Sequence, residues 1–372
     1  MVNKERLVEE FLELVQIDSE SKNEAEIALV LKAKLEDLGL DVVEDDTKEE
    51  TGLGSGNLIA RLKGNVQSAD TILFNCHFDT VSPGNGVVPV INDDIIETDK
   101  TTILGADDKA GIAALLEGVR LLKEGNIAHG DIEIVLTPGE EIGLLGAKAV
   151  DIKSLNAKYG FTLDSGGTVG EIIVASPDHG KIKAKIHGVA AHAGIAPEDG
   201  ASAIEIAAKA ITNMPLGRLD KELTANIGII KGGEFTNIVC DLVEITGEAR
   251  AITFSKLENQ MKAMRAALEE AAAERDCTVD VEISYDRVGY TLKETDRVVE
   301  VAKAALVKVG RKPYLQATGG GSDANIFTIA KIPTANLGVG YLNIHSKEEK
   351  MPISELVKLT ELVVEIVKTV VV

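Results

Sequence analysis

One histidine and several acids recur at the ends of short apolar segments in this chain of 372 residues. His77 and Asp79 follow the apolar run 72–74 and stand two positions apart. Because side chains alternate between the faces of a strand, residues two apart project from the same side. An imidazole and a carboxylate placed together in this way could form half of a metal site. Taken alone, a His-x-Asp pair is more often an ordinary surface pair.

Later segments carry acids at the same kind of position, namely Asp107 with Asp108, Glu140 with Glu141, and Asp164. The first pair stands before the helical pattern 112–122, where an acid can simply cap a helix and complement its dipole. One acid is enough for that role. The second pair follows an apolar strand pattern and lies between glycines, where the backbone can turn sharply. Repeated acids at strand exits are poorly explained by solvation alone.

Short apolar strands that alternate with helical patterns predict an open α/β sheet. Ligands of such sheets bind beyond the carboxyl ends of the strands, so the acids and His77 should converge on one cleft. Unpaired carboxylates would repel each other there, and a divalent cation is the simplest way to hold them together. One imidazole among several carboxylates suits zinc, manganese or cobalt better than calcium or magnesium.

We predict an α/β fold with two domains, as the chain is long for a single core. Residues 1–177 and 289–372 are expected to form a discontinuous domain with a mixed, mostly parallel sheet and helices on both faces. Residues 178–288 are expected to form a smaller inserted α+β domain. The insert is predicted from strand and helix patterns at residues 181–188, 201–213, 224–230, 239–252, 256–275 and 279–285.

Three local patterns lead to further predictions. Ser21 and Glu24 fit a capping box at the start of a helix. Residues 353–370 read as an amphipathic helix that closes the chain. Residues 319–324 fit a loose dinucleotide-binding pattern, but no clear strand precedes it, so we do not assign it that role.

Composition excludes several classes of partner. The net charge of -21 would repel phosphate backbones and anionic membranes, and the absence of Trp argues against a stacking surface for nucleic acid. The N-terminus lacks the apolar core of a signal peptide, and no apolar run reaches membrane-spanning length. Three scattered cysteines, Cys76, Cys240 and Cys277, indicate no disulfide framework and favour the cytoplasm.

Two histidines outside the acidic pattern remain candidates for chemistry. His192 lies in a loop rich in Gly, Ala and Pro, with no helical face to bury it, so it is either exposed or functional. His345 follows the strand pattern 333–340 and could supply a second imidazole to the cleft.

Together these segments resemble the di-zinc metallopeptidases related to peptidase T, carboxypeptidase G and the aminoacylases, and they are nearest to peptidase T. The resemblance covers nearly the whole chain in family order. Any one motif is weak, but their joint occurrence is specific. It rests on His-Phe-Asp-Thr at 77–80, Gly-Ala-Asp-Asp-Lys-Ala-Gly at 105–111, Thr-Pro-Gly-Glu-Glu-Ile-Gly at 137–143, Asp-Ser-Gly-Gly at 164–167, the His-Ala-Gly that begins at His192, and His345.

The resemblance implies two zinc ions, with cobalt or manganese as substitutes. Asp107 would bridge them, and the other ligands would be His77 and Asp164 for one ion and Glu141 and His345 for the other. Asp108 would be only a helix-end acid.

The family also implies roles around the metal ions. Glu140 would move the proton of the attacking water, and Asp79 would orient His77. His192 would reach the oxyanion, often from a neighbouring subunit, so the resemblance implies a homodimer through an inserted lid or dimerisation domain. Arg250 resembles the anchor for a substrate carboxylate, and Asn237 resembles a substrate contact.

The implied activity is hydrolysis of short peptides, with removal of the N-terminal residue of di- or tripeptides. A related dipeptidase, carboxypeptidase or N-acyl-amino-acid deacylase stays open, because residues 345–351 are more charged and less aromatic than expected of peptidase T. A non-catalytic metal- or peptide-binding protein is the other alternative. Retention of both Glu140 and Glu141 argues against it, since a pure binder needs no free base. No Gly-x-Ser-x-Gly motif supports a serine hydrolase.

Overall fold

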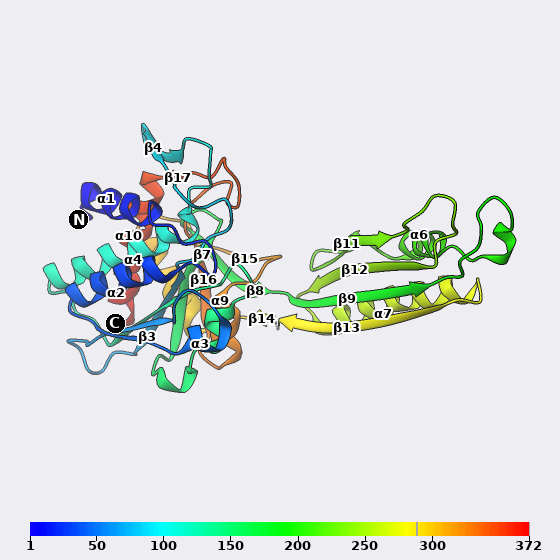
Figure 1. Cartoon of the computed structure of the whole chain (residues 1–372). Coiled ribbons are helices and arrows are strands. Elements are labelled where there is room, and N and C mark those ends of the chain that lie inside the picture. The colour runs from blue at the N-terminus through cyan, green and yellow to red at the C-terminus, as the bar shows by residue number, and fades with distance from the viewer. Residues whose placement is uncertain (288, 372) are drawn as a thin grey trace. The chain divides into compact units, whose positions relative to one another are not determined.

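The computed structural model describes residues 1–287 and 289–371, which divide into two compact units (Figure 1). The second unit contains Ala175–Thr291 and Thr318–Gly320, and the other described residues form the first unit. Each unit has its own sheet and its own helices.

The main sheet of the first unit runs in the order β1-β2-β6-β3-β7-β16-β8, with β15 beside β8. The four strands β6, β3, β7 and β16 are parallel, whereas β1, β2 and β8 pair antiparallel. Every residue of β3 and β6 is buried, as expected of central parallel strands. This arrangement confirms the predicted mixed α/β fold. The strand bounds are β1 Asp41–Glu44, β2 Leu58–Leu62, β3 Ile72–His77, β6 Ile132–Thr137, β7 Tyr159–Ser165, β8 Glu171–Ser176, β15 Tyr314–Ala317 and β16 Thr334–Gly338.

Helices pack on this sheet and on each other in the first unit (Figure 1). The helix α4 packs against β3 and β7, and α1 and α10 pack against α4. The helix α9 contacts β3, β7 and β16, with Phe327 buried in a separate apolar cluster beside Leu73 and Val135. The helix bounds are α1 Lys4–Val15, α2 Ala25–Asp37, α3 Thr47–Thr51, α4 Ala106–Glu124, α5 Leu145–Ala149, α8 Arg297–Lys308, α9 Asp323–Ile329 and α10 Ile353–Val370, with a 3₁₀ turn η1 at Ile152–Ser154.

The structure confirms one of the two local helix predictions and contradicts the other. The C-terminal helix is confirmed, since α10 spans Ile353–Val370 and buries a continuous apolar face. The predicted capping box is wrong, because Glu24 accepts hydrogen bonds from the backbone N–H groups of Lys22 and Gly54 instead. Ser21 donates its hydroxyl to Asp79 at 2.7 Å, so a long-range contact replaces the local one.

A small antiparallel sheet in the first unit joins β4 (Pro89–Asn92), β5 (Ile95–Thr98) and β17 (Met351–Pro352) in the order β17-β5-β4. Its strand β17 leads directly into α10 and follows the segment that carries His345. The sheet therefore helps to fix the chain just after His345.

The second unit is an antiparallel sheet in the order β10-β11-β12-β9-β13 with two helices packed against it (Figure 1). The strand β9 alternates buried and more exposed residues, which matches a sheet with one covered face. Its core contains Ile182, Ile245 and Met261, contributed by β9, β12 and α7. The bounds are β9 Asp178–His187, η2 Pro197–Asp199, α6 Ala203–Asn213, β10 Gly217–Arg218, β11 Leu223–Gly232, β12 Leu242–Ala251, α7 Phe254–Ala273, β13 Thr278–Arg287 and β14 Tyr290–Thr291.

Among residues 1–287 and 289–371, no helix combines the length and the apolar character needed to cross a membrane. All three cysteines are free.

Candidate metal centre

Side chains from four separate segments of the first unit meet at one edge of the main sheet. His77 ends β3, Asp164 lies near the end of β7, and Glu141 follows β6 in the next loop. These three strands are parallel neighbours, so their carboxyl ends lie at the same edge. Asp107 comes from the first turn of α4, where its backbone departs from helical geometry. The sheet thus brings together residues up to 87 positions apart (His77 to Asp164).

Asp107 lies between two imidazoles. Its Oδ1 atom is 3.1 Å from His77 Nε2, and its Oδ2 atom is 3.3 Å from His345 Nε2. Asp164 Oδ1 lies 3.8 Å from His77 Nε2, and Glu141 Oε1 lies 2.8 Å from His345 Nε2. Each oxygen of Asp107 therefore faces a different group, and the carboxylate is placed to serve two adjacent sites.

The donor set fits divalent metal ions. Ligand atoms of His77, Asp107 and Glu141 lie within 4.8 Å of one another, as do those of His77, Asp108 and Asp164. Two imidazole nitrogens and several carboxylate oxygens within one small volume are the ligands that zinc, manganese and cobalt accept. Without a cation, burial and the nearby Asp107 raise the pKa of the Asp164 carboxyl well above its usual range.

The histidines respond to the same crowding of negative charge. Hydrogen bonds with Asp107 and Glu141 raise the pKa of His345 to about 10. Burial lowers the pKa of His77, but hydrogen bonds with Asp107 and Asp79 outweigh it and raise that pKa well above its usual value. The His345 imidazole is therefore protonated at neutral pH in the metal-free chain.

Metal binding is accordingly expected to release protons. A metal ion needs the neutral imidazole, so at pH 7 an ion held by His345 would have to displace its proton, because the pKa of His345 is about 10. Affinity should therefore rise with pH throughout the range from 6 to 9, where the competing proton becomes scarcer. Calorimetric titration in buffers of different ionisation enthalpy measures the released protons. His345→Ala should release fewer than the parent chain, and an equal count in both would contradict this assignment.

Asp79 links the His77 ring to the 140–141 loop through hydrogen bonds. One of its oxygens accepts from the backbone N–H of Glu140 at 2.9 Å, and the other accepts from that of Glu141 at 3.3 Å. The backbone carbonyl of Asp79 lies 3.0 Å from His77 Nδ1, and the Ser21 hydroxyl donates to Oδ2 of the Asp79 carboxylate. Asp79 is fully buried, so these bonds fix the His77 ring and the 140–141 loop together.

Glu140 has the environment of a proton carrier. Burial and the nearby carboxylates Asp164 and Asp323 raise the pKa of its carboxyl well above the usual range, although His77 opposes the change. A buried carboxyl group with a raised pKa is a common feature of residues that accept and return a proton during catalysis.

Asp108 differs from its predicted role as a helix-end acid. Its side chain is buried, and Oδ2 accepts the backbone N–H of His77 at 3.3 Å. The helix α4 begins without a side-chain cap. Asp108 therefore packs on the end of β3 beside the cluster and does not complement a solvent-exposed helix end.

Glu349 supports the site and was not identified from the sequence. Its buried carboxylate accepts the backbone N–H groups of Leu104, Gly105 and Asp107 at 2.8, 2.8 and 3.1 Å. Burial raises its pKa to about 7. These bonds tie the turn that presents Asp107 to the segment that carries His345. The sequence shows only an acid four positions after His345, which by itself indicates nothing.

The predicted substrate contacts lie in the second unit, at two places. His192 and Asn237 are exposed in adjacent loops, where Ala193 donates its backbone N–H to the Asn237 carbonyl at 3.0 Å. Arg250 lies near the C-terminal end of β12. Its register partner on the neighbouring strand β9 is His179. Its guanidinium binds Glu248 through Nε at 2.9 Å and the Gly319 carbonyl through Nη1 at 3.1 Å.

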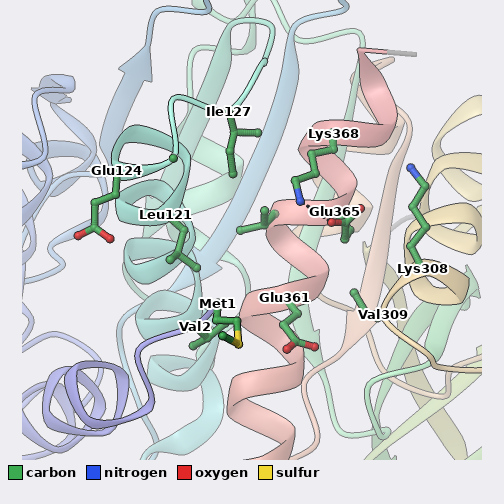
Figure 2. Close-up of a pocket in the computed structure, with 12 residues that line it drawn as sticks. Met1, Val2, Leu121, Glu124, Ile127, Lys308, Val309, Glu361, Glu365 and Lys368 are labelled. Atoms are coloured by element: carbon green, nitrogen blue, oxygen red, sulfur yellow. Dashed lines mark hydrogen bonds and ion pairs between the residues drawn. The ribbon is translucent and has the colours of Figure 1, made fainter.

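The first unit contains a cavity of about 580 Å³ (Figure 2). The ends of α4, α8 and α10 line it, with Leu121, Lys308 and Glu365 among the lining side chains. None of the predicted site residues lines this cavity, so it does not belong to the metal cluster.

The sequence of this chain matches a known protein family. A model of the peptidase family M20/M25/M40 matches residues 73–369. Peptidase T of Fusobacterium nucleatum is 33% identical over 282 residues, which cover 75% of this chain and 68% of that protein.

Two solved structures are similar over almost their whole length. Aminopeptidase PepT from Bacillus cereus has a TM-score of 0.95 and 55% identity, with 99% of each chain covered. A tripeptidase from Staphylococcus aureus has a TM-score of 0.97 and 42% identity, and the match covers 100% of this chain and 99% of that one. The predicted resemblance to peptidase T is confirmed.

Proposed function

We propose that this chain, which belongs to the peptidase family M20/M25/M40, is a metal-dependent aminopeptidase that removes the N-terminal residue of short peptides. The observation that carries the proposal is the pair of adjacent glutamates in the loop fixed by Asp79. Glu141 faces His345 in the ligand cluster, whereas Glu140 has the raised pKa of a proton carrier. A cluster that only stored metal ions would not need the second carboxyl group.

Two divalent ions are part of the proposal, with zinc preferred and cobalt or manganese as substitutes. His77, Asp107 and Asp164 would hold one ion, and Asp107, Glu141 and His345 would hold the other. When bound, such ions activate water and polarise a carbonyl group. Asp107 suits the shared position because its two oxygens already face the two imidazoles.

The chain's own residues then complete the hydrolysis. Glu140 would take a proton from the attacking water and later give it to the leaving amine, so its carboxyl ends each turnover unchanged. Asp79 would keep the His77 ring and the backbone of Glu140 in place during both transfers. Arg250 would bind the substrate carboxylate after exchanging part of its contact with Glu248.

A homodimer through the second unit is the proposed assembly. His192 bridges to Ile238, which precedes β12, whereas Arg250 lies near the far end of β12, and residues 242–250 span about 26 Å at the usual strand rise. An extended tripeptide reaches only about 10 Å, so both residues of one chain would not readily contact the same substrate. A His192 supplied by a neighbouring subunit removes this difficulty.

The edge of the second sheet offers a surface for such a contact. Among the described residues, β10 pairs with β11 only at 224 and 225, which leaves residues 226–232 at the sheet edge. Ile229 and Ile230 on this edge are about half exposed, at 49% and 53%. An unpaired, apolar edge strand is a template for pairing with a second copy.

Complementation tests whether His192 acts across subunits. Glu140→Ala and His192→Ala should each be nearly inactive, but after mixing and subunit exchange half of the dimers pair one of each. One of the two sites in such a dimer has all its residues, so about a quarter of the parent activity should return. Absence of recovery, with exchange verified by mass spectrometry, would contradict the shared site.

The substrate class is tested with a tripeptide, its N-acetylated form and an N-acetyl amino acid, each with added zinc, cobalt or manganese and with chelator. We expect chelator-sensitive release of free amino acids from the unblocked tripeptide only. Cleavage of the acetylated substrates would assign the chain to carboxypeptidases or deacylases instead. Bound metal without any turnover would support a binding protein.

A cytoplasmic location stays a prediction, supported by the three free cysteines.

A further inference from the structure

Tyr341 is a buried phenol inside the ligand cluster. Its side chain is 1% exposed, although the residue lies in the segment between β16 and the exposed His345. It is among the largest fully buried side chains of the chain. A buried tyrosine usually needs a partner for its hydroxyl, so the position of that group shows what the residue does.

The hydroxyl of Tyr341 meets two of the proposed metal ligands. It lies 3.2 Å from Asp164 Oδ1 and 3.4 Å from Asp107 Oδ1. These are the two carboxylate oxygens that also approach His77 Nε2. A phenol has one proton to donate, and the shorter contact identifies Asp164 as its main acceptor.

Hydrogen bonds of the segment just before Tyr341 fix this placement. Val339 donates its N–H to the Ser165 carbonyl and Gly340 to the Gly167 carbonyl, both at 2.9 Å. Asn336 on β16 binds the main chain of Asp164 twice, accepting its N–H at 3.0 Å and donating to its carbonyl at 2.9 Å. The segment 336–341 therefore holds Asp164 through both its main chain and its carboxylate.

We propose that Tyr341 is a positioning residue of the metal centre, which directs one oxygen of Asp164 by hydrogen bonding and so sets the affinity of the ion held by His77, Asp107 and Asp164. The hydrogen bond orients the Asp164 carboxylate before an ion arrives. Residues that hydrogen-bond a metal ligand typically contribute about 10- to 100-fold to affinity. The proposal rests on the proposed function only in taking this cluster as a metal site.

The test measures metal binding directly, without a substrate. Calorimetric titration of Tyr341→Phe with zinc should show one of two sites weakened about 10- to 100-fold, with the other little changed. The cobalt-loaded variant should show a changed visible spectrum, because the geometry at one ion changes. Tyr159→Phe is the matched control, since Tyr159 is also buried and begins β7, about 16 Å along the strand from Asp164.

A second measurement tests the role of Tyr341 in the unmodified protein. The chain has five tyrosines and no tryptophan, so a change in tyrosine absorption on metal binding can be observed directly in the unmodified protein. We expect a near-ultraviolet difference signal that follows zinc occupancy, persists in Tyr159→Phe and is lost in Tyr341→Phe.

The outcomes separate this inference from the proposed function. Two ions bound by Tyr341→Phe with parent affinity and an unchanged cobalt spectrum would overturn the role of Tyr341 and leave the peptidase proposal standing. If Tyr341→Phe does not fold, absence of any tyrosine signal in the metal-loaded parent chain would also overturn it. A parent chain that binds no metal would overturn both proposals.

Discussion

Glu140→Gln is expected to lower kcat for tripeptide hydrolysis by about two to four orders of magnitude, the usual contribution of a general acid and base. Glutamine keeps the size of the side chain but can neither accept nor return the proton. The backbone N–H of residue 140 would still bind Asp79, so the loop should keep its conformation. Metal content after dialysis should stay at the parent value, because Glu140 is outside the proposed ligand set.

The control for this variant is Glu49→Gln, which changes an exposed acid on α3 of the same unit. Its kcat and metal content should match those of the parent chain. Should Glu140→Gln retain more than about a tenth of the parent kcat with both ions bound, Glu140 would not be the proton carrier.

Asp107→Asn should lower both the metal content and kcat, since Asp107 faces both imidazoles. An amide offers one neutral oxygen in place of two charged ones and would not serve two ions. We expect the metal content to fall from two ions per chain to less than one, and kcat to fall more than about 100-fold, beyond the effect typical of outer partners. Elemental analysis of the dialysed variant, together with initial rates at saturating zinc, measures both quantities.

A comparison with His345→Ala shows whether Asp107 is shared. His345 contacts Asp107 and Glu141 but not the His77 side of the cluster, so its removal should cost one ion only. Equal metal contents in Asp107→Asn and His345→Ala, each short of one ion, would contradict the bridging position of Asp107.

The convergence of the candidate metal ligands was predictable from sequence because it follows a rule of α/β sheets. His77, Glu141 and Asp164 each come at the end of a strand whose apolar run is visible in the sequence. Once these strands are parallel neighbours, their carboxyl ends must meet at one edge. The resemblance to peptidase T favours Asp107 over Asp108 as the shared ligand, and this choice stays a prediction, since both acids lie in groups that could hold an ion.

The supporting residues were not predictable, because their roles depend on contacts between distant segments. Ser21 fits a local capping box in the sequence, but its hydroxyl donates to Asp79, 58 positions away. Glu349 binds the turn at 104–107, and Tyr341 reaches Asp164 across 177 positions. Neither residue belongs to a local motif, and only the folded chain reveals its acceptor or donor.

The order of product release from a tripeptide with three different residues, such as Leu-Gly-Phe, is the most direct test of aminopeptidase activity. Mass spectrometry at less than a tenth of full conversion would identify the first products formed by the zinc-loaded enzyme. We expect free leucine and the dipeptide Gly-Phe in equal amounts, with neither formed in the presence of chelator. Free phenylalanine and Leu-Gly as the first products would contradict an aminopeptidase, and so would an intact tripeptide with both metal ions bound.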